Sequence, residues 1–448
     1  MDVLVKLSQF LLSLSLLIVL HELGHFIPAK LFKTRVEKFY LFFDIKFSLF
    51  KKKIGDTVYG IGWLPLGGYV KIAGMIDESM DTEQMKQEPQ PWEFRSKPAW
   101  QRLIIMLGGV TVNFLLAFVI YIGMTWYYGD RFIANEDLKN GVWVQSPVLE
   151  NSGMQSGDKI ISIDGRNLSR INEAPAQLIT AKEIVVERDG QKETINLPVD
   201  FVDQFMASGT GTLVAPRIPL IVSAVPEDSH NKNVLKPGDF ITQLNGVDIE
   251  FADQLKPQLN DLNGQSVPAV VKRDDEEIEV TLNISEEGTI GMAFALGVKE
   301  KDAERLGLYK ISHERYSLAA SIPIGLQKGK NQLTGYWKQL KMIVQPETGA
   351  YKGVGGFKAI YDVFPSSWSW EVFWNITAFL SIMLGVMNLL PIPALDGGHV
   401  MFLLYEMISG RKPSDKFMEY AQTVGFLILI ALLLFANGND IFKAIMGK

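Results

Sequence analysis

Residues 10–25 have the sequence FLLSLSLLIVLHELGH, an apolar run that ends in two histidines and a glutamate. With its flanks, over 7–32, the segment is long and apolar enough to cross a bilayer as a helix. His21 and His25 are four residues apart, so they lie on one face of that helix, as two ligands of one metal ion require. Glu22 adjoins the first histidine and can reach a water molecule at the metal without being a ligand. Such groups are costly at membrane depth and mark functional sites. The stretch therefore predicts hydrolysis within a membrane.

Composition limits both the fold and the ligands. A chain of 448 residues is long enough for several domains. Its net charge of −6, without a dominant run of Lys or Arg, argues against nucleic-acid binding. There is no cysteine, and only five histidines. Disulfides, thiolate zinc sites and cysteine nucleophiles are excluded, which leaves His and carboxylates as the strong metal ligands.

Four segments are predicted to span the membrane, at 7–32, 102–126, 371–391 and 420–437. A removable signal peptide at the N-terminus is the weaker alternative, because no small-residue cleavage site follows the first apolar run. The stretch after the first span is rich in Lys and Arg, which predicts that it faces the cytoplasm. The N-terminus, the long region 128–370 and the C-terminus would then lie on the outer side.

Two regions outside the spans have β-strand character. In 36–75, aromatic runs alternate with glycines, which favours a membrane-associated β-hairpin; such backbone is tolerated at membrane depth only where protein or a water-filled cavity satisfies it. In the outer region, SGDKIISIDG (156–165) recurs as PGDFITQLNG (237–246). Each copy is a turn, an alternating strand and an Asp-Gly or Asn-Gly hairpin turn, which predicts two α+β PDZ-like domains.

A third metal ligand is expected near the end of the third span. There the sequence NLLPIPALDGGH (388–399) has two prolines that interrupt the helix, and Asp396 precedes a Gly-Gly pair that permits close approach. Asp396 falls on the same side of the membrane as the end of the first span. A plain solvated helix end is the alternative. His399 could compete as the ligand, whereas His230 and His313 are expected at the surface.

Together these motifs resemble the site-2 protease family of intramembrane zinc metalloproteases (peptidase M50), and more narrowly its bacterial branch of sigma-E regulators. The likeness also includes LPLGGYVK (64–71) and Asn113-Phe114. It implies one Zn²⁺ held by His21, His25 and Asp396, with Glu22 as the catalytic base. It implies that Asn388 binds substrate backbone. The hairpin, with Gly67, Gly68 and Tyr69, is expected on physical grounds to accept an unwound substrate segment as an added strand.

The resemblance also implies partners and a location. Substrates would be single-span membrane proteins, such as an anti-sigma factor first trimmed by a site-1-type protease, and remnant signal peptides. The location would be the bacterial inner membrane, with the PDZ-like domains periplasmic and the active site near the cytoplasmic side. The PDZ-like pair could bind exposed C-termini or act as a steric filter. A non-enzymatic PDZ scaffold with a vestigial metal site is the competing function; a transporter is disfavoured, because four spans offer no repeat symmetry.

The predicted fold class is a polytopic α-helical membrane protein with four transmembrane helices, a membrane-associated β-hairpin and two PDZ-like domains. The expected segments are helix 1 (1–35), the re-entrant hairpin and loop (36–101), helix 2 (102–127), the PDZ-like domains (128–218 and 219–298), an amphipathic helical linker (299–370), helix 3 (371–393), a cytoplasmic loop with the Asp ligand (394–419), and helix 4 with the C-terminus (420–448).

Overall fold

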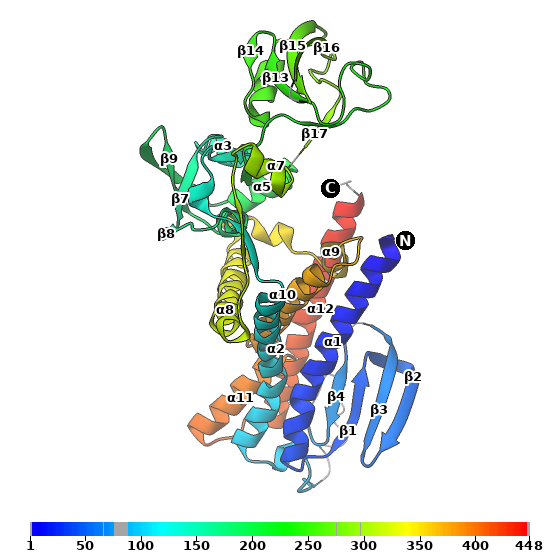
Figure 1. Ribbon diagram of the computed structural model, residues 1–448. Helices are drawn as coiled ribbons and strands as arrows, with labels where there is room; N and C mark the ends of the chain where they lie inside the picture. The colour runs from blue at the N-terminus through cyan, green and yellow to red at the C-terminus, as the bar shows by residue number, and fades with distance from the viewer. Residues whose placement is uncertain (1, 66, 76–87, 275, 296, 446–448) are drawn as a thin grey trace. The chain divides into compact units, whose positions relative to one another are not determined.

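Figure 1 shows the computed structural model, which describes residues 2–65, 67–75, 88–274, 276–295 and 297–445. The chain divides into two compact units. Unit 1 comprises residues 1–129, 315–337 and 354–448, and unit 2 comprises 130–314 and 338–353.

Unit 1 contains four helices long and apolar enough to cross a membrane, among the residues that the structure describes. They are α1 (Asp2–Leu31), α2 (Ala99–Tyr127), α10 (Trp370–Leu389) and α12 (Asp415–Ile445). The four predicted spans correspond to them, although α1 starts earlier and α12 is longer at both ends than predicted. Pro391 and Pro393 lie beyond the last turn of α10, as expected for residues that cannot continue a helix.

The backbones of α1 and α2 touch where they cross. A Cβ added to Gly24 would lie 2.6 Å from the carbonyl carbon of Gly108, and one added to Gly108 would lie 2.7 Å from that of Gly24. Small residues allow this close approach of membrane helices. Buried polar contacts also join α10 to each of these helices. The Ser13 hydroxyl of α1 and the Thr377 hydroxyl of α10 are 2.9 Å apart, and Ser381 Oγ of α10 donates to the Asn113 carbonyl of α2 at 2.7 Å. The crossing at Gly24 therefore sits inside the HELGH motif itself.

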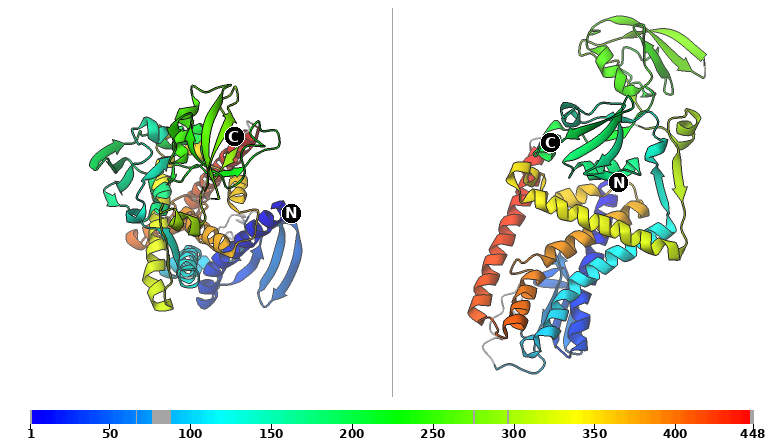
Figure 2. Two further views of the ribbon diagram at one scale, coloured as in Figure 1. Left: turned by 45° about the horizontal axis from the view of Figure 1, so that its top comes forward. Right: turned by 90° about the vertical axis from the view of Figure 1, so that its left-hand side faces the viewer.

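The 36–75 region folds into a four-stranded sheet that lies along α1 (Figures 1 and 2). Its strands are β1 (Val36–Leu41), β2 (Phe43–Ile54), β3 (Thr57–Leu64) and β4 (Tyr69–Ile72), in the order β2-β3-β1-β4. β2 and β3 pair as an antiparallel hairpin, β1 runs parallel to β3, and β4 forms one edge. The predicted hairpin is thus part of a larger sheet, and its association with the membrane stays a prediction.

Three further helices complete unit 1: α8 (Leu318–Ile343, of which residues up to 337 belong here), α9 (Phe357–Val363) and α11 (Asp396–Ser409). α8 packs closely on α2, because a Cβ on Gly325 would lie 2.6 Å from Ile122 Cα. The Lys328 ammonium donates to Thr125 Oγ1 at 2.9 Å. The end of α12 holds the start of α9: Asp440 accepts hydrogen bonds from the backbone of Gly356 and Ala359.

Unit 2 contains two copies of one arrangement, strand–strand–helix–strand–strand, with equivalent sheet orders β8-β7-β9-β10 and β14-β13-β15-β16. Each Asp-Gly or Asn-Gly turn has both residues at positive φ, as a tight hairpin turn requires. Each copy also has a buried Asp–Arg pair, Asp158–Arg188 and Asp239–Arg273. The first copy comprises β7 (Lys159–Ile163), β8 (Arg166–Asn167), α4 (Ala174–Leu178), β9 (Glu183–Arg188) and β10 (Gln191–Asn196); the second comprises β13 (Phe240–Leu244), β14 (Val247–Asp248), α6 (Leu255–Leu259), β15 (Ser266–Arg273) and β16 (Glu276–Asn283).

Short elements flank the two copies, and each copy has its own apolar core. These elements are β5 (Asp130–Ile133), β6 (Val142–Val144), α3 (Pro147–Asn151), α5 (Phe201–Ser208), β11 (Val214–Pro216), β12 (Val222–Ala224), β17 (Ala293–Phe294), α7 (Glu300–Arg305) and β18 (Ile311–Glu314). The identification of the copies as PDZ-like stays a prediction.

The region 299–370 differs from the helical linker expected there. Its first part belongs to unit 2: β18 pairs antiparallel with β5, and Leu308 and Tyr309 are buried in the core of the first copy. The helices of this region are α7, which belongs to unit 2, and α8 and α9. Apolar residues such as Leu308 gain more by joining this core than by lining an exposed linker.

Candidate metal centre

Three side chains from the two ends of the chain converge inside unit 1. The Nε2 atoms of His21 and His25 are 3.3 Å apart, and Asp396 Oδ2 lies 3.5 Å from the first and 3.3 Å from the second. All three residues are largely buried, and they form the one group of three or more potential ligands found among the described residues. Helix α1 supplies both imidazoles from one face, and the first residue of α11 supplies the carboxylate.

These spacings fit a tetrahedral zinc ion. Zinc bonds of about 2.0–2.2 Å to nitrogen and oxygen give a tetrahedron with edges of about 3.3–3.6 Å. The three measured separations, 3.3, 3.3 and 3.5 Å, fall in that range. Asp396 Oδ2 is buried and accepts no hydrogen bond from the described residues. A buried carboxylate oxygen in that situation is costly unless a cation compensates it. Three ligands leave one corner of the tetrahedron for water or substrate.

The chain brings Asp396 to the histidines through the loop after α10. α10 ends at Leu389, residues 390–395 form a turn with Ala394 at φ 87°, and α11 starts at Asp396. The loop folds tightly over the two glycines that follow the aspartate: a Cβ on Gly398 would lie 2.6 Å from the Ile392 carbonyl oxygen. A carboxylate in the first turn of a helix is also favoured by the helix dipole.

Contacts from α2 hold both imidazole rings, and these contacts were not predicted. His25 Nδ1 lies 2.9 Å from the Ile105 carbonyl oxygen, and His21 Nδ1 lies 3.0 Å from the Asn113 side-chain nitrogen. A Cβ on Gly109 would lie 2.6 Å from Cε1 of His21 and 2.8 Å from Cε1 of His25. The glycine thus leaves room for both rings. A Gly-Gly pair within an apolar span was the available signal for this close packing.

The other predicted site residues are placed as follows. Glu22 is partly exposed and adjoins His21 on α1. The Asn388 amide nitrogen lies 3.3 Å from His21 Nε2. Gly68 lies against α1, since a Cβ there would be 3.7 Å from Glu22 Cγ, and Gly67 contacts the Phe43 ring in the same way. Glu22, Asn388 and Gly68 thus lie in one region around the histidines, whereas the contacts of Gly67 are with the sheet.

Tyr69 has a different set of contacts. Its hydroxyl donates to Asp44 Oδ1 at 2.7 Å and accepts from Lys38 at 3.1 Å. Its ring stacks on those of Tyr40 and Phe43. The side chain therefore stabilises the sheet, and only its backbone on the edge strand β4 is positioned to meet another strand.

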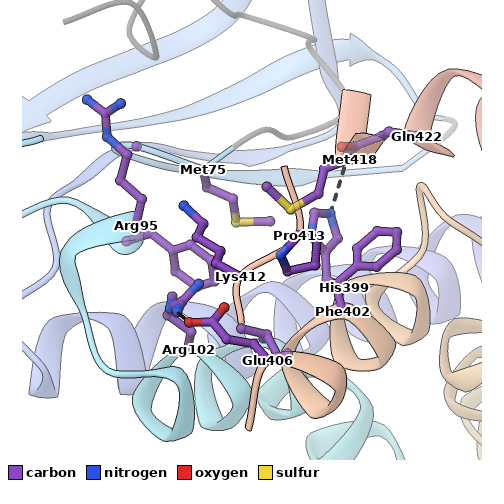
Figure 3. Close-up of a pocket in the computed structure, with 13 residues that line it drawn as sticks. Met75, Arg95, Arg102, His399, Phe402, Glu406, Lys412, Pro413, Met418 and Gln422 are labelled. Atoms are coloured by element: carbon purple, nitrogen blue, oxygen red, sulfur yellow. Dashed lines mark hydrogen bonds and ion pairs between the residues drawn. The ribbon is translucent and has the colours of Figure 1, made fainter. Parts of the chain in front are cut away.

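The remaining histidines lie outside the metal group. His399 lines a pocket between α2, α11 and the start of α12, with its Nε2 at 3.3 Å from the Gln422 amide nitrogen (Figure 3). The same pocket contains the Arg102–Glu406 ion pair, which ties α2 to α11. His230 and His313 are exposed in unit 2, and His313 pairs with Glu300 at 2.7 Å.

Comparison with known proteins agrees with this geometry. The model of Peptidase family M50 matches residues 9–432. The chain belongs to peptidase family M50. Similar proteins are found in Xylella fastidiosa, assigned as a zinc metalloprotease (26% identity, 98% of this chain and 99% of that one); in Yersinia pestis, named protease RseP (27%, 98% and 99%); and in Haemophilus influenzae, named regulator of sigma E protease (27%, 99% and 100%).

Membership in the M50 family has direct consequences. The chain is a metalloendopeptidase and a multi-pass membrane protein. Relatives named as zinc metalloproteases support zinc as its metal, and the ligand geometry supports the same ion.

Proposed function

We propose that this M50 protein is an intramembrane zinc endopeptidase in which His21, His25 and Asp396 hold the metal and Glu22 is the general base. The observation that carries the proposal is the meeting of three ligand atoms at tetrahedral separations, 3.3–3.5 Å, within a set of apolar helices. Asp396 is 371 residues beyond His25 in the chain, so a chance meeting of these groups is a poor explanation. A glutamate beside the first ligand is what a hydrolase needs and a scaffold does not.

The side chains divide the chemistry among them. A bound zinc ion supplies Lewis acidity, which makes a water molecule nucleophilic and polarises the scissile carbonyl. Glu22 accepts the proton of the attacking water and returns it to the leaving amine. Asn388 donates its amide N–H to the substrate backbone. The buried surroundings strengthen each of these interactions, because they exclude bulk water.

Substrates are proposed to be single-span membrane proteins. A transmembrane helix hides its carbonyls in its own hydrogen bonds, so it must unwind before hydrolysis. The edge strand β4 begins beside Gly68, close to Glu22, and an unwound segment can add to it as a further strand. Relatives named for sigma E regulation favour an anti-sigma factor, already trimmed by a site-1-type protease, as one such substrate; remnant signal peptides are another.

The proposed setting is the bacterial inner membrane, with the active site near the cytoplasmic side and the N-terminus, unit 2 and the C-terminus periplasmic. The excess of Lys and Arg after α1 supports this orientation. The two copies in unit 2 are proposed to be PDZ-like domains that exclude substrates with bulky outer domains. Binding of a new C-terminus by strand addition is the alternative, and deletion of both copies would distinguish them: a filter predicts cleavage of untrimmed substrate.

The test of the enzyme is Glu22→Gln, compared with Glu150→Gln, which changes an exposed glutamate in unit 2. We expect Glu22→Gln to lose cleavage of a membrane-embedded substrate and to keep one zinc per chain. Glu150→Gln should match the wild type. Retained cleavage in Glu22→Gln would contradict the role of the base and favour the non-enzymatic scaffold.

A second experiment tests the β4 edge. Proline removes a backbone donor, so Val70→Pro in β4 should slow cleavage without lowering zinc content. Leu49→Pro in β2, at the opposite edge of the sheet, is the control for general damage to the sheet. Equal rates in both variants would argue against strand addition at β4.

A further inference from the structure

The hydrogen-bond partner of His21 Nδ1 is not the one that a metal-binding imidazole needs. A neutral imidazole that binds a metal through Nε2 carries its proton on Nδ1, so Nδ1 must donate a hydrogen bond. In the structure the group facing His21 Nδ1 is the Asn113 amide nitrogen, at 3.0 Å, which is itself a donor. Two donors cannot share a hydrogen bond. The pair as it stands requires the other tautomer, with a proton on the nitrogen that faces Asp396.

His25 shows the arrangement that a metal ligand needs. Its Nδ1 lies 2.9 Å from the Ile105 carbonyl oxygen, which can only accept. The proton of His25 is therefore fixed on Nδ1, and its Nε2 lone pair is directed toward Asp396. His21, one helical turn away in the same motif, interacts with the Gly109 backbone of α2, and the Asn113 amide faces its Nδ1 at 3.0 Å.

Asn113 carries an acceptor, and it is unused. The residue is fully buried, and its Oδ1 has no hydrogen-bond partner among the described residues. A buried amide oxygen without a partner destabilises the folded state. Turning the amide by half a turn about its last bond exchanges Oδ1 and Nδ2. That turn gives both the oxygen and the imidazole proton a partner without moving the backbone.

We propose that Asn113 is the positioning residue of the metal site: in the zinc-loaded protein its Oδ1 accepts the Nδ1–H of His21. The inference rests on the proposed zinc site. It gives each imidazole one acceptor from α2, a backbone carbonyl for His25 and a side-chain amide for His21. The Asn113 backbone is in turn fixed to α10, since Ser381 Oγ donates to its carbonyl at 2.7 Å.

Two substitutions separate an acceptor from a donor at this position. Asn113→Asp has oxygen at both terminal positions and no N–H, whereas Asn113→Leu keeps a similar size and has neither. Zinc affinity is measured by competition with a zinc-binding dye, using the full chain in detergent. Loss of an outer partner of a metal-binding histidine weakens affinity by about 10–100-fold. We expect that loss in Asn113→Leu, and affinity at least equal to wild type in Asn113→Asp.

Thr377→Val is the control, because it removes a buried polar contact between α10 and α1, to the Ser13 hydroxyl, without touching an imidazole. It should bind zinc as the wild type does. The proposal is overturned if Asn113→Asp binds as weakly as Asn113→Leu, or if Asn113→Leu binds as tightly as wild type. If Asn113→Leu does not fold, the proposal is overturned when Asn113→Asp binds zinc more weakly than the wild type. A wild type that binds no zinc would instead refute the proposed metal site.

Discussion

Gly109 offers the sharpest test of how α2 shapes the metal centre. The substitution is Gly109→Ala, which adds one methyl group. The new Cβ would come closest to His25 Nε2, the nitrogen that faces the metal, and would lie 2.6 Å from His21 Cε1 and 2.8 Å from His25 Cε1. Ordinary van der Waals contact begins at 3.4 Å, so the His21 ring must retreat by about 0.8 Å. Because metal sites tolerate about 0.2 Å in ligand distance, a shift of this size spoils the ligand set.

The expected result is a loss of zinc affinity of about 100-fold, equivalent to about 2.8 kcal/mol. Helix propensity acts in the opposite direction, since Gly→Ala within a helix stabilises it by up to about 1 kcal/mol. A folded variant that has lost zinc is therefore the specific signature of steric displacement. Zinc affinity by dye competition and thermal unfolding in detergent measure the two effects separately.

Gly123→Ala is the control on the same helix, because a Cβ there meets nothing within 4 Å. It should keep wild-type zinc affinity. Wild-type affinity in Gly109→Ala would refute the reasoning, since it would mean that the rings can move aside without cost to the ligand geometry.

Three other predictions address the metal, the α8–α2 contact and unit 2. Chelation should abolish cleavage and added Zn²⁺ should restore it, measured on a membrane-embedded substrate; activity that survives complete zinc removal would contradict the metal mechanism. Gly325→Val should lower thermal stability by about 1–3 kcal/mol, because its side chain would meet Ile122. Gly335→Ala on the same helix meets nothing within 4 Å and should leave thermal stability unchanged. Equal melting temperatures in the two variants would show that α8 can move away from α2 without cost. In unit 2, burial alone would raise the pKa of Asp239, but hydrogen bonds from Arg273 and the Lys236 amide hold it below 3.8. That stabilisation is present above pH 3.8 and is lost as the pH falls through the lowered folded-state pKa. Arg273→Gln should therefore speed hydrogen exchange in β13 and β15 at pH 7, with a cost of about 3 kcal/mol. The difference in opening free energy from the wild type should shrink as the pH falls below 3.8; a constant difference would argue against the ion pair.

The sequence predicts the parts of the site that depend on local spacing. Two histidines four residues apart share a helix face whatever the rest of the fold, so their pairing needs no tertiary information. The prediction of Asp396 as a ligand rested on the family resemblance as well as on the sequence of its loop, because the distance from Asp396 to α1 depends on how α10 ends. The contacts of Asn113, Ile105 and Gly109 could not be predicted. α2 is apolar on all sides, so its hydrophobic pattern does not specify which face turns toward α1.

The parts of the fold that were not predicted are pairings between short strands that lie far apart in the sequence. β18 has four residues, ISHE, and pairs with β5 from the opposite end of unit 2. Four residues carry too little alternation to indicate a strand. In the sheet beside α1, the aromatic and glycine pattern indicated strands, but the parallel pairing of β1 with β3 depends on which edges meet, and no local signal encodes that.

The crossing of α1 and α2 and the metal site are one structural feature. Gly24 and Gly108 let the two backbones touch, which brings Gly109 against both rings and sets the Ile105 carbonyl beside His25. A larger residue at the crossing would separate the helices and withdraw the partner of His25 together with that of His21. Polar ligands buried among apolar helices cannot rely on water to hold them. Gly24, Gly108 and Gly109 are therefore as necessary to the site as the ligands, and zinc affinity should report on helix spacing even where no ligand is changed.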